Sequence, residues 1–245
     1  MIESIGGELI EKVDFAITAT HAIAGDGKAP LRRTPKLMIC ICKTPNILNL
    51  GWLTNSFKAK KALDPKDFLL LNDTTAEKTY DFSMEKTLQN GAAVRSQRGG
   101  LLGGWSVHFC KGVAGKKAPP EHELCLIVAA GGGTFLKTAS ARATKAVDAS
   151  KIIIITSDPA TAAQKSDKDV KRLVSQGAKV FTTKWFFHSV ITQHLSDIED
   201  APVAGDDEEV DQKPAASSHE KGGRKRKAAT PSSRSPKRES RRRKR

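Results

Sequence analysis

The chain has 245 residues, and its 41 Lys and Arg residues outnumber its 27 Asp and Glu residues, which gives a formal net charge of +14 at pH 7. Hydrophobic residues make up 38% of the sequence, but the longest apolar runs are far shorter than the roughly 18 residues of a membrane span, which excludes a transmembrane helix. Four cysteines without a Cys-x-x-Cys spacing are too few for a disulfide scaffold, and the first residues lack the features of a secretory signal. We therefore expect an intracellular protein with buried thiols.

The first 60 residues follow an alternating α/β pattern. The pair Gly6-Gly7 precedes a predicted strand over residues 14–24, a helix over residues 35–42 and a short strand over residues 47–50, and a further helix begins near Trp52. A separate helix is predicted around residues 77–90, where it would link this region to the next.

The same pattern returns in the second part of the chain, which indicates an internal repeat. Gly132 follows Gly7 by 125 residues, and Trp185 follows Trp52 by 133 residues. The predicted strands of this copy cover residues 105–113, 151–156 and 178–182, and its predicted helices cover residues 121–130 and 169–176. A continuous run of isoleucine at residues 152–155 is typical of a strand buried on both faces of a parallel sheet. We therefore predict two small three-layer α/β domains.

Three stretches of sequence resemble tandem BRCT domains. They are residues 31–59 (LRRTPKLMICICKTPNILNLGWLTNSFKA), residues 76–88 (AEKTYDFSMEKTL) and residues 130–136 (AGGGTFL). The resemblance covers residues 1 to about 196 and implies two domains, each with a parallel four-stranded sheet flanked by helices. It also implies a first domain over residues 1–74, a linker with a helix over residues 75–98 and a second domain over residues 99–196. Residues 197–245 are predicted to be a disordered tail, first acidic and then basic, because the basic part has no large apolar side chain whose burial could offset the cost of ordering its backbone.

The resemblance implies that the first domain lacks its first strand. In the family this strand is interior to the sheet and ends in Ser/Thr-Gly, which contacts the phosphate, whereas here the chain starts after it. Three interpretations stay open: a truncated chain, a partner that completes the sheet, or a degenerate domain that binds no phosphate. Because loss of an interior strand exposes backbone donors and acceptors, we favour truncation.

A candidate anion site lies at the start of the helix predicted over residues 35–42. Thr34 suits the N-cap position, Pro35 suits the first helical position and Lys36 falls in the first turn. A cation there opposes the helix dipole unless an anion binds, so Arg33 and Lys36 predict a pocket for a phosphoryl group. The alternative is that both are solvated loop charges. The BRCT resemblance implies that Lys36 contacts the phosphate and Arg33 the peptide, and we count Thr34 with the phosphate-binding residues.

The resemblance also implies a groove for the side chain three residues after the phosphoresidue, lined by Lys111 and His188. Lys111 stands where a smaller apolar residue is common, which changes the expected peptide preference.

No arrangement of residues indicates catalysis, a metal or a cofactor. His108 and Cys110 would point to opposite faces of their predicted strand, so they cannot chelate one ion. The glycines at residues 131–133 follow a helix, whereas a phosphate loop follows a strand. Trp52 and Trp185 head apolar helices and are predicted to pack in the core. We therefore expect a protein without catalytic activity, metal or cofactor.

The positive charge is concentrated at the end of the chain. Residues 221–245 hold 13 Lys and Arg residues against a single acid, Glu239, and they follow an acidic run at residues 206–211. Two basic clusters on either side of a Ser/Pro-rich spacer predict a bipartite nuclear localisation signal. Its residues are Arg224, Lys225, Arg226, Lys227, Arg241, Arg242, Arg243, Lys244 and Arg245. The alternative is a solvated polycation that binds DNA or RNA by counterion release.

These features predict a nuclear adaptor of the DNA damage response that recognises phosphoserine motifs through a tandem BRCT pair. Its expected partners are phosphorylated nuclear proteins, a phosphorylated histone tail among them, and the oligomeric state is left open. The competing hypothesis is a chromatin or nucleic-acid binding protein that acts through its basic tail, with the BRCT pair as a phosphate-independent protein-interaction module.

Overall fold

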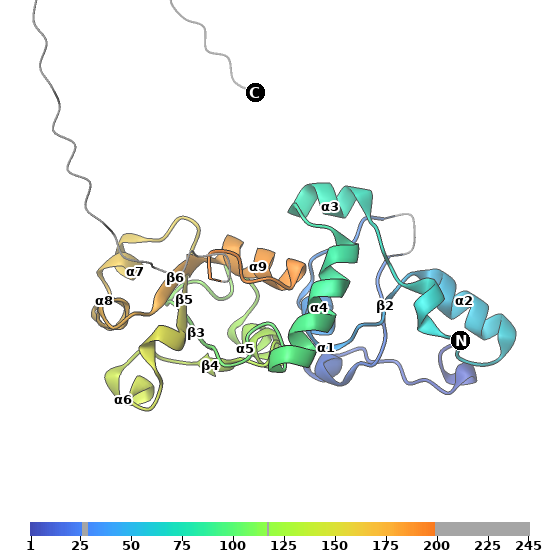
Figure 1. The fold of residues 1–245 in the computed structure, drawn as a ribbon, viewed down its shortest axis with the longest axis horizontal. Helices are drawn as coiled ribbons and strands as arrows, with labels where there is room; N and C mark the ends of the chain where they lie inside the picture. Colours follow the sequence, from blue (N-terminus) through green and yellow to red (C-terminus); the bar gives the residue numbers. More distant parts are fainter. Residues whose placement is uncertain (26–28, 117, 199–245) are drawn as a thin grey trace, which may run out of the picture. The chain divides into compact units, whose positions relative to one another are not determined.

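A computed structural model describes residues 1–25, 29–116 and 118–198 of the chain (Figure 1). These residues belong to one compact unit. Within these ranges, no helix is long and apolar enough to cross a membrane. For clarity we call residues 1–73 the N-terminal half, residues 74–98 the linker and residues 99–198 the C-terminal half.

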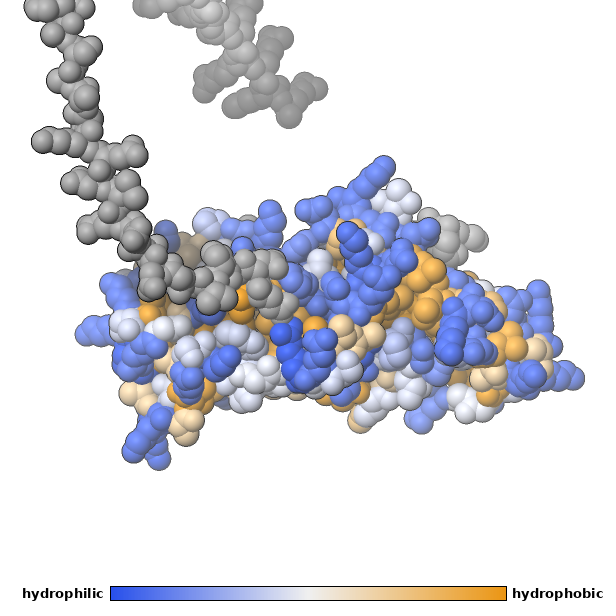
Figure 2. All heavy atoms as spheres, viewed as in Figure 1, coloured by the Kyte–Doolittle hydropathy of each residue, from blue (hydrophilic) through white to orange (hydrophobic). Residues whose placement is uncertain are grey.

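The N-terminal half contains a small parallel sheet of two strands, β1 (Ala22–Ile23) and β2 (Ile47–Leu48). Ala22 pairs with Ile47 and Ile23 with Leu48. The other elements are the helices α1 (Pro35–Lys43) and α2 (Leu50–Ala59) and the 3-10 helices η1 (Glu3–Ile5), η2 (Val13–Thr18) and η3 (Pro65–Phe68). Hydrophobic side chains reach the surface between α2 and the linker (Figure 2).

The strand predicted over residues 14–24 is correct only at its end. Residues up to Thr18 form η2, and only Ala22–Ile23 is strand. The spacing explains the difference, because Val13, Ala16 and Ile17 lie on one face of a helical turn, where they pack against the core. The tertiary contacts of that face decide in favour of the helical turn.

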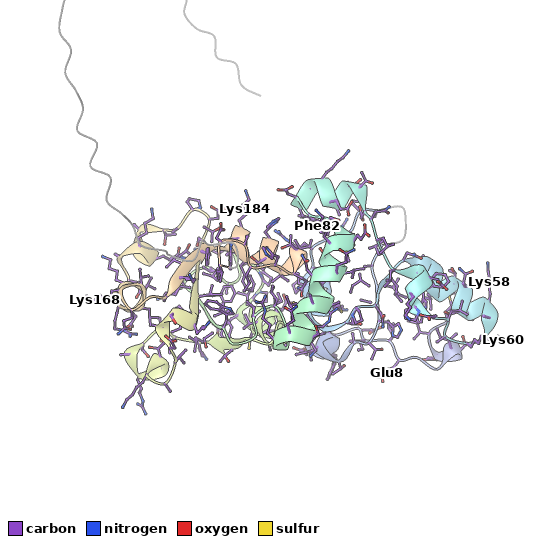
Figure 3. The ribbon with its side chains drawn as sticks, in the orientation of Figure 1. Glu8, Lys58, Lys60, Phe82, Lys168 and Lys184 are labelled. Carbon is purple, nitrogen blue, oxygen red and sulfur yellow. The ribbon has the colours of Figure 1, made fainter. Side chains whose placement is uncertain are left out.

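The linker forms two helices, α3 (Thr74–Tyr80) and α4 (Met84–Arg98), where the sequence predicted one around residues 77–90. Asp81 ends α3 in the left-handed conformation with φ 55°, and the Ser83 side chain accepts from the Lys86 amide to cap α4. Phe82 lies at the break between the helices, where it packs against the core (Figure 3). The cap at Ser83 is the signal that divides the predicted helix.

The C-terminal half contains a four-stranded parallel sheet with strand order β4-β3-β5-β6. Its strands are β3 (Ser106–Phe109), β4 (Thr134–Leu136), β5 (Ile152–Thr156) and β6 (Lys179–Thr182). Its helices are α5 (Glu121–Ala130), α6 (Ala141–Thr144), the 3-10 helix η4 (Ala149–Lys151), α7 (Ala162–Ser166), α8 (Lys168–Ser175) and α9 (Thr183–Thr192). The predicted helix at residues 121–130 and the buried isoleucine strand are confirmed, whereas β4, α6 and α7 were not predicted.

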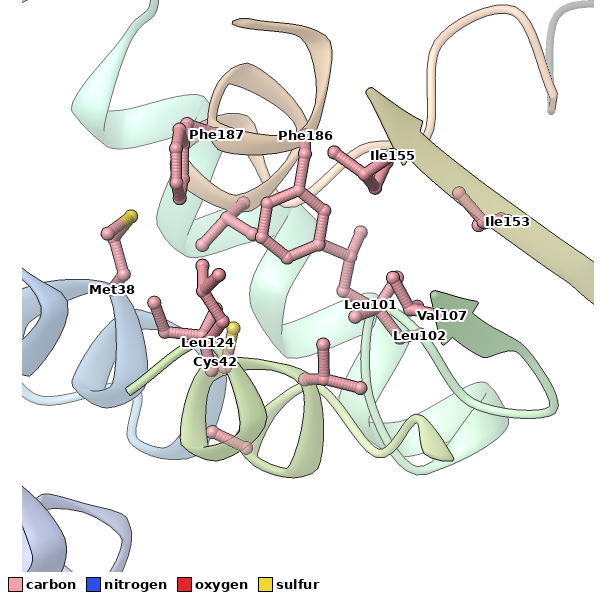
Figure 4. Close-up of a cluster of buried hydrophobic side chains, with 14 of the residues drawn as sticks. Met38, Cys42, Leu101, Leu102, Val107, Leu124, Ile153, Ile155, Phe186 and Phe187 are labelled. Atoms are coloured by element: carbon pink, nitrogen blue, oxygen red, sulfur yellow. The ribbon is translucent and has the colours of Figure 1, made fainter. Parts of the chain in front are cut away.

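Helix α1 packs against the C-terminal half. Its residues 37–42 are all buried, and it contacts α5 and α9. Met38 and Cys42 lie in one cluster with Leu124 of α5 and with Phe186 and Phe187 of α9 (Figure 4). The hydrophobic core is therefore continuous from one half to the other.

Side chains of α4 bond to the last carbonyl groups of the helices beside it. Thr87 Oγ1 donates to the Ile191 carbonyl at 2.7 Å, and Asn90 Nδ2 donates to the Thr192 carbonyl at 3.0 Å. Arg95 Nη1 donates to a carbonyl near the end of α1, that of Ile41, at 3.1 Å. Carbonyls at helix ends have no partner within the helix, so these bonds tie α9 and α1 to the linker.

Candidate functional site

The start of α1 has the geometry that the sequence predicts. The Thr34 side chain accepts from the Leu37 amide at 3.3 Å, and Pro35 occupies the first turn. Thr34 is exposed, so its hydroxyl hydrogen stays available to a ligand. The Lys36 amide lies in this first turn, at the positive end of the helix dipole, which favours anion binding.

Lys36 is half-buried rather than freely solvated. Its Nζ atom donates a hydrogen bond to the backbone carbonyl of Glu11, 25 residues earlier in the chain. An ammonium group has three donors, so two remain for a ligand. The sequence did not predict this contact, because nothing in the local pattern relates the segment before η2 to the start of α1.

Arg33 lies between two aromatic rings from different parts of the chain. Its guanidinium carbon is 5.0 Å from the centroid of the Tyr80 ring in α3 and 5.3 Å from the centroid of the Phe187 ring in α9. Burial lowers the pKa of Arg33 from its ordinary value, and Tyr80 acts in the opposite direction. Arg33 therefore connects the start of α1 to the linker and to the C-terminal half.

The guanidinium of Arg33 makes no hydrogen bond to any residue that the structure describes. Stacking uses the faces of the group and leaves its five N–H donors in the plane, where a carboxylate or phosphate binds. This half-buried cation is consistent with the predicted role in ligand binding and differs from a solvated loop charge.

His188 lines a cavity of about 350 Å³ between α9 and the start of α4. Asp81, Lys86 and Asn90 also contribute to its wall. The rings that flank Arg33 are next in sequence to residues of this cavity: Tyr80 precedes Asp81, and Phe187 precedes His188. Arg33 and the cavity therefore both lie where the linker meets α9.

Lys111 is not part of this cavity. It is exposed at the end of β3, where its carbonyl accepts a hydrogen bond from Gln164 Nε2 of α7 at 3.1 Å. The structure brings His188 together with residues of the linker. The groove that the BRCT resemblance implies for Lys111 and His188 stays a prediction.

The chain was compared with known proteins by sequence and by structure. No family model matches it. Over 133 residues, 54% of its length, the chain is 32% identical to mediator of DNA damage checkpoint protein 1 of Mus musculus. Over the same length it is 29% identical to the Homo sapiens protein of that name. Over 89 residues, 36% of the chain, it is 34% identical to PAX-interacting protein 1 of Bos taurus. These matches span only 7%, 6% and 8% of the relatives' own lengths.

Solved structures also match, among them one that aligns over most of the chain. The crystal structure of the S. pombe Brc1 BRCT5-BRCT6 domains aligns with a TM-score of 0.58 and 20% identity, and it covers 80% of this chain and 86% of that one. The chain folds as a tandem BRCT pair. This result confirms the tandem BRCT resemblance and the α/β fold class.

Within this BRCT pair, Arg33, Thr34 and Lys36 lie at the start of α1, and His188 lies on α9 in the other half. Sequence reasoning missed Tyr80 and Phe187, which hold the Arg33 side chain. Phe187 is buried two residues after Trp185. Of the two tryptophans predicted to pack in the core, Trp52 is buried and Trp185 is half-buried. The predicted nuclear localisation residues, from Arg224 to Arg245, lie outside the described residues.

Proposed function

We propose that this BRCT pair is a non-enzymatic adaptor of the DNA damage response that binds phosphoserine peptides in the nucleus. The relatives with the matching sequences carry DNA damage checkpoint in their name, which supports the pathway. The proposed ligands are phosphorylated nuclear proteins, with a phosphorylated histone tail as one of them.

The observation that carries the proposal is the Arg33 side chain. It is a half-buried cation with donors that the described residues leave unused, held by two rings beside the first turn of α1. A phosphoryl group at that turn would meet the helix N-terminus and the ammonium of Lys36, and the peptide backbone or a carboxylate would meet Arg33. His188 and its cavity would receive the residues that follow the phosphoserine.

The test is a titration of the whole chain with a phosphoserine peptide that carries a free carboxylate three residues on, beside its unphosphorylated twin. Only the phosphorylated peptide should bind, and Lys36→Ala should weaken it about tenfold or more, because a hydrogen bond to a charged group contributes about 1.5–3 kcal/mol. Lys43→Ala is the matched control, since Lys43 is an exposed cation at the other end of the same helix.

Arg33→Gln separates peptide binding from general electrostatics. It keeps a planar polar group between the rings, but it removes the charge and the bidentate donors, so binding should fall by a further order of magnitude. Equal affinity for the phosphorylated peptide and its twin would contradict the proposal.

A second candidate function rests on the charge of the tail. Residues 221–245 carry 13 Lys and Arg residues, enough for nucleic-acid binding by counterion release. Such binding should weaken steeply as the salt concentration is raised and should be lost when residues 221–245 are deleted. Lys36→Ala should leave its affinity unchanged. Phosphopeptide binding should survive the same deletion, so one pair of proteins distinguishes the two functions.

A further inference from the structure

The cavity between α9 and the start of α4 has a polar wall. Of the residues that line it, only Phe82 is apolar, and the others carry hydroxyl, amide, imidazole or charged groups. Its volume of about 350 Å³ is near the lower end of the range for small-ligand sites. The cavity can therefore hold one polar side chain with its hydration water, and the chemistry of the wall decides which kind.

The backbone acceptors beside this cavity are already occupied. They belong to the last turn of α9, whose four final carbonyl groups have no partner within a regular helix. Each of the four accepts a hydrogen bond from outside the regular helix pattern, so this negative end of the helix dipole attracts a cation only weakly. The bonds run from the His194 amide to Ser189, from Gln193 Nε2 to Val190, from Thr87 Oγ1 to Ile191 and from Asn90 Nδ2 to Thr192.

Donors in the wall, by contrast, are left for a ligand. The Ser83 oxygen accepts from the Lys86 amide, so the hydroxyl hydrogen of Ser83 stays available. The ammonium of Lys86 makes no hydrogen bond or ion pair with any residue that the structure describes. α4 begins at the same wall, and its positive dipole end adds to the charge of Lys86. The wall therefore favours an acceptor, and above all an anion.

The charges around the cavity agree with this preference. Asp81 is the one acid among the lining residues; like Lys86 it is exposed, so the two charges roughly offset each other. Lys184 lies one helical turn before His188, on the same face of α9, and its charge is not offset by another lining residue. Arg33, stacked on the ring next to His188 in sequence, is a further cation. The balance at the cavity is therefore positive.

We propose that this cavity binds a second anionic side chain of the phosphoserine peptide, either a carboxylate or a second phosphoryl group. The inference rests on the proposed function, because the same peptide has to bind at the start of α1 and pass Arg33. The rings that flank Arg33 belong to the residues directly before Asp81 and His188, so the path from Arg33 to the cavity is short. The second anion therefore follows the residue that meets Arg33, and the ligand is an acidic or multiply phosphorylated segment.

The test uses fluorescein-labelled phosphoserine peptides with alanine at positions four to eight after the phosphoserine. One of these positions at a time carries glutamate, phosphoserine or lysine, and anisotropy titrations of the whole chain measure each affinity. At one position or two neighbouring ones, glutamate should bind about two- to fivefold more tightly than alanine, as a charge pair at a partly exposed site does. A second phosphoserine should bind about tenfold more tightly, because it carries up to two charges. Lysine should bind no more tightly than alanine.

Lys86→Glu assigns the preference to the cavity. Glutamate suits the third position of a helix that is capped by serine, so the fold should be kept. In this variant the lysine peptide should bind more tightly than the glutamate peptide. Lys78→Glu is the matched control, since Lys78 is an exposed cation on α3 outside the cavity. The same change of charge there should leave the preference for glutamate in place.

The phosphopeptide with alanine at all five positions separates this inference from the proposed function. If it binds but no position favours glutamate or phosphoserine over alanine, the inference is wrong and the proposed function stands. An equal loss of the preference in Lys86→Glu and Lys78→Glu would show general electrostatic attraction and would also overturn the inference. If no phosphopeptide binds at all, both are wrong.

Discussion

Each half contains a pair of parallel strands and a helix whose tryptophan donates a hydrogen bond to a carbonyl eleven residues later. The two halves are nevertheless stabilised differently. The C-terminal half has a four-stranded sheet whose central residues Ile152–Ile155 are completely buried. The N-terminal half has a sheet of two strands with two residues each, which is too little for a stable sheet of its own. Its burial comes instead from α1, where residues 37–42 pack on α5 and α9.

Although the sequence pattern is repeated, the N-terminal copy depends for its stability on the other half. A nine-residue helix is marginal by itself in water, so α1 gains its stability from the surface of the other half. Each buried Leu, Met or Ile side chain of α1 contributes about 1.5–3 kcal/mol by burial. The N-terminal half should therefore unfold when the C-terminal half does.

The largest expected effect comes from Phe186→Ala. Phe186 is fully buried, and its removal should lower the free energy of unfolding by about 3–5 kcal/mol. Urea denaturation measures the loss, and hydrogen exchange shows where it acts. If the N-terminal half depends on the C-terminal half, the amides of Ala22 and Ala24 should lose protection together with those of β5.

Phe57→Ala, at a residue that is 44% exposed, is the control and should change the free energy of unfolding by about 0.5 kcal/mol or less. Loss of protection in the C-terminal half alone would show that the halves fold separately.

A smaller effect tests whether the repeated unit has the same strength in both copies. Trp52→Phe and Trp185→Phe each remove an indole hydrogen bond, of 2.9 Å to Leu63 and of 3.1 Å to Ser196. Each should cost about 1–2 kcal/mol, because the carbonyl loses its partner. Thermal unfolding of the two variants under the same conditions measures the costs. A cost at Trp52 close to zero would mean that the copy in the N-terminal half contributes little to stability.

The smallest effect near neutral pH concerns one buried thiol in each half. Burial raises the pKa of Cys42 and of Cys110 to about 11 from the ordinary value of 9.0. The unfolded chain therefore loses these protons first as pH rises, so the contribution to stability is complete below pH 9 and is lost between about pH 9 and 11. The slope is at most ~1.4 kcal/mol per pH unit for each thiol.

Cys42→Ala and Cys110→Ala should each flatten the alkaline decline of stability relative to the unchanged chain, with no pH-dependent difference below pH 8. Urea denaturation over pH 7 to 11 measures the difference. An unchanged slope in Cys42→Ala would indicate that this thiol is accessible to water.

The parts of the fold that were predictable have local signals. The buried isoleucine strand and the helix at residues 121–130 in the C-terminal half, and the N-cap at Thr34 in the N-terminal half, all follow from patterns a few residues long, and the structure confirms them. The strand expected over residues 14–24 was wrong in its first part, since Val13, Ala16 and Ile17 gain more by packing as a helical turn on α1. The linker helix was divided at Asp81 and Ser83, where capping outweighs helix propensity.

At the candidate site, residue type and order suffice to predict the charges and the cap at the start of α1, because they set the first turn of a helix. The surroundings of these residues follow from tertiary contacts and could not be predicted. Arg33 lies between Tyr80 and Phe187, Lys36 bonds to the carbonyl of Glu11, and His188 lines a cavity with residues of the linker. These contacts join residues up to 154 positions apart in the sequence, as from Arg33 to Phe187. They form because burial of hydrophobic side chains between α1, α5 and α9 holds the two halves together.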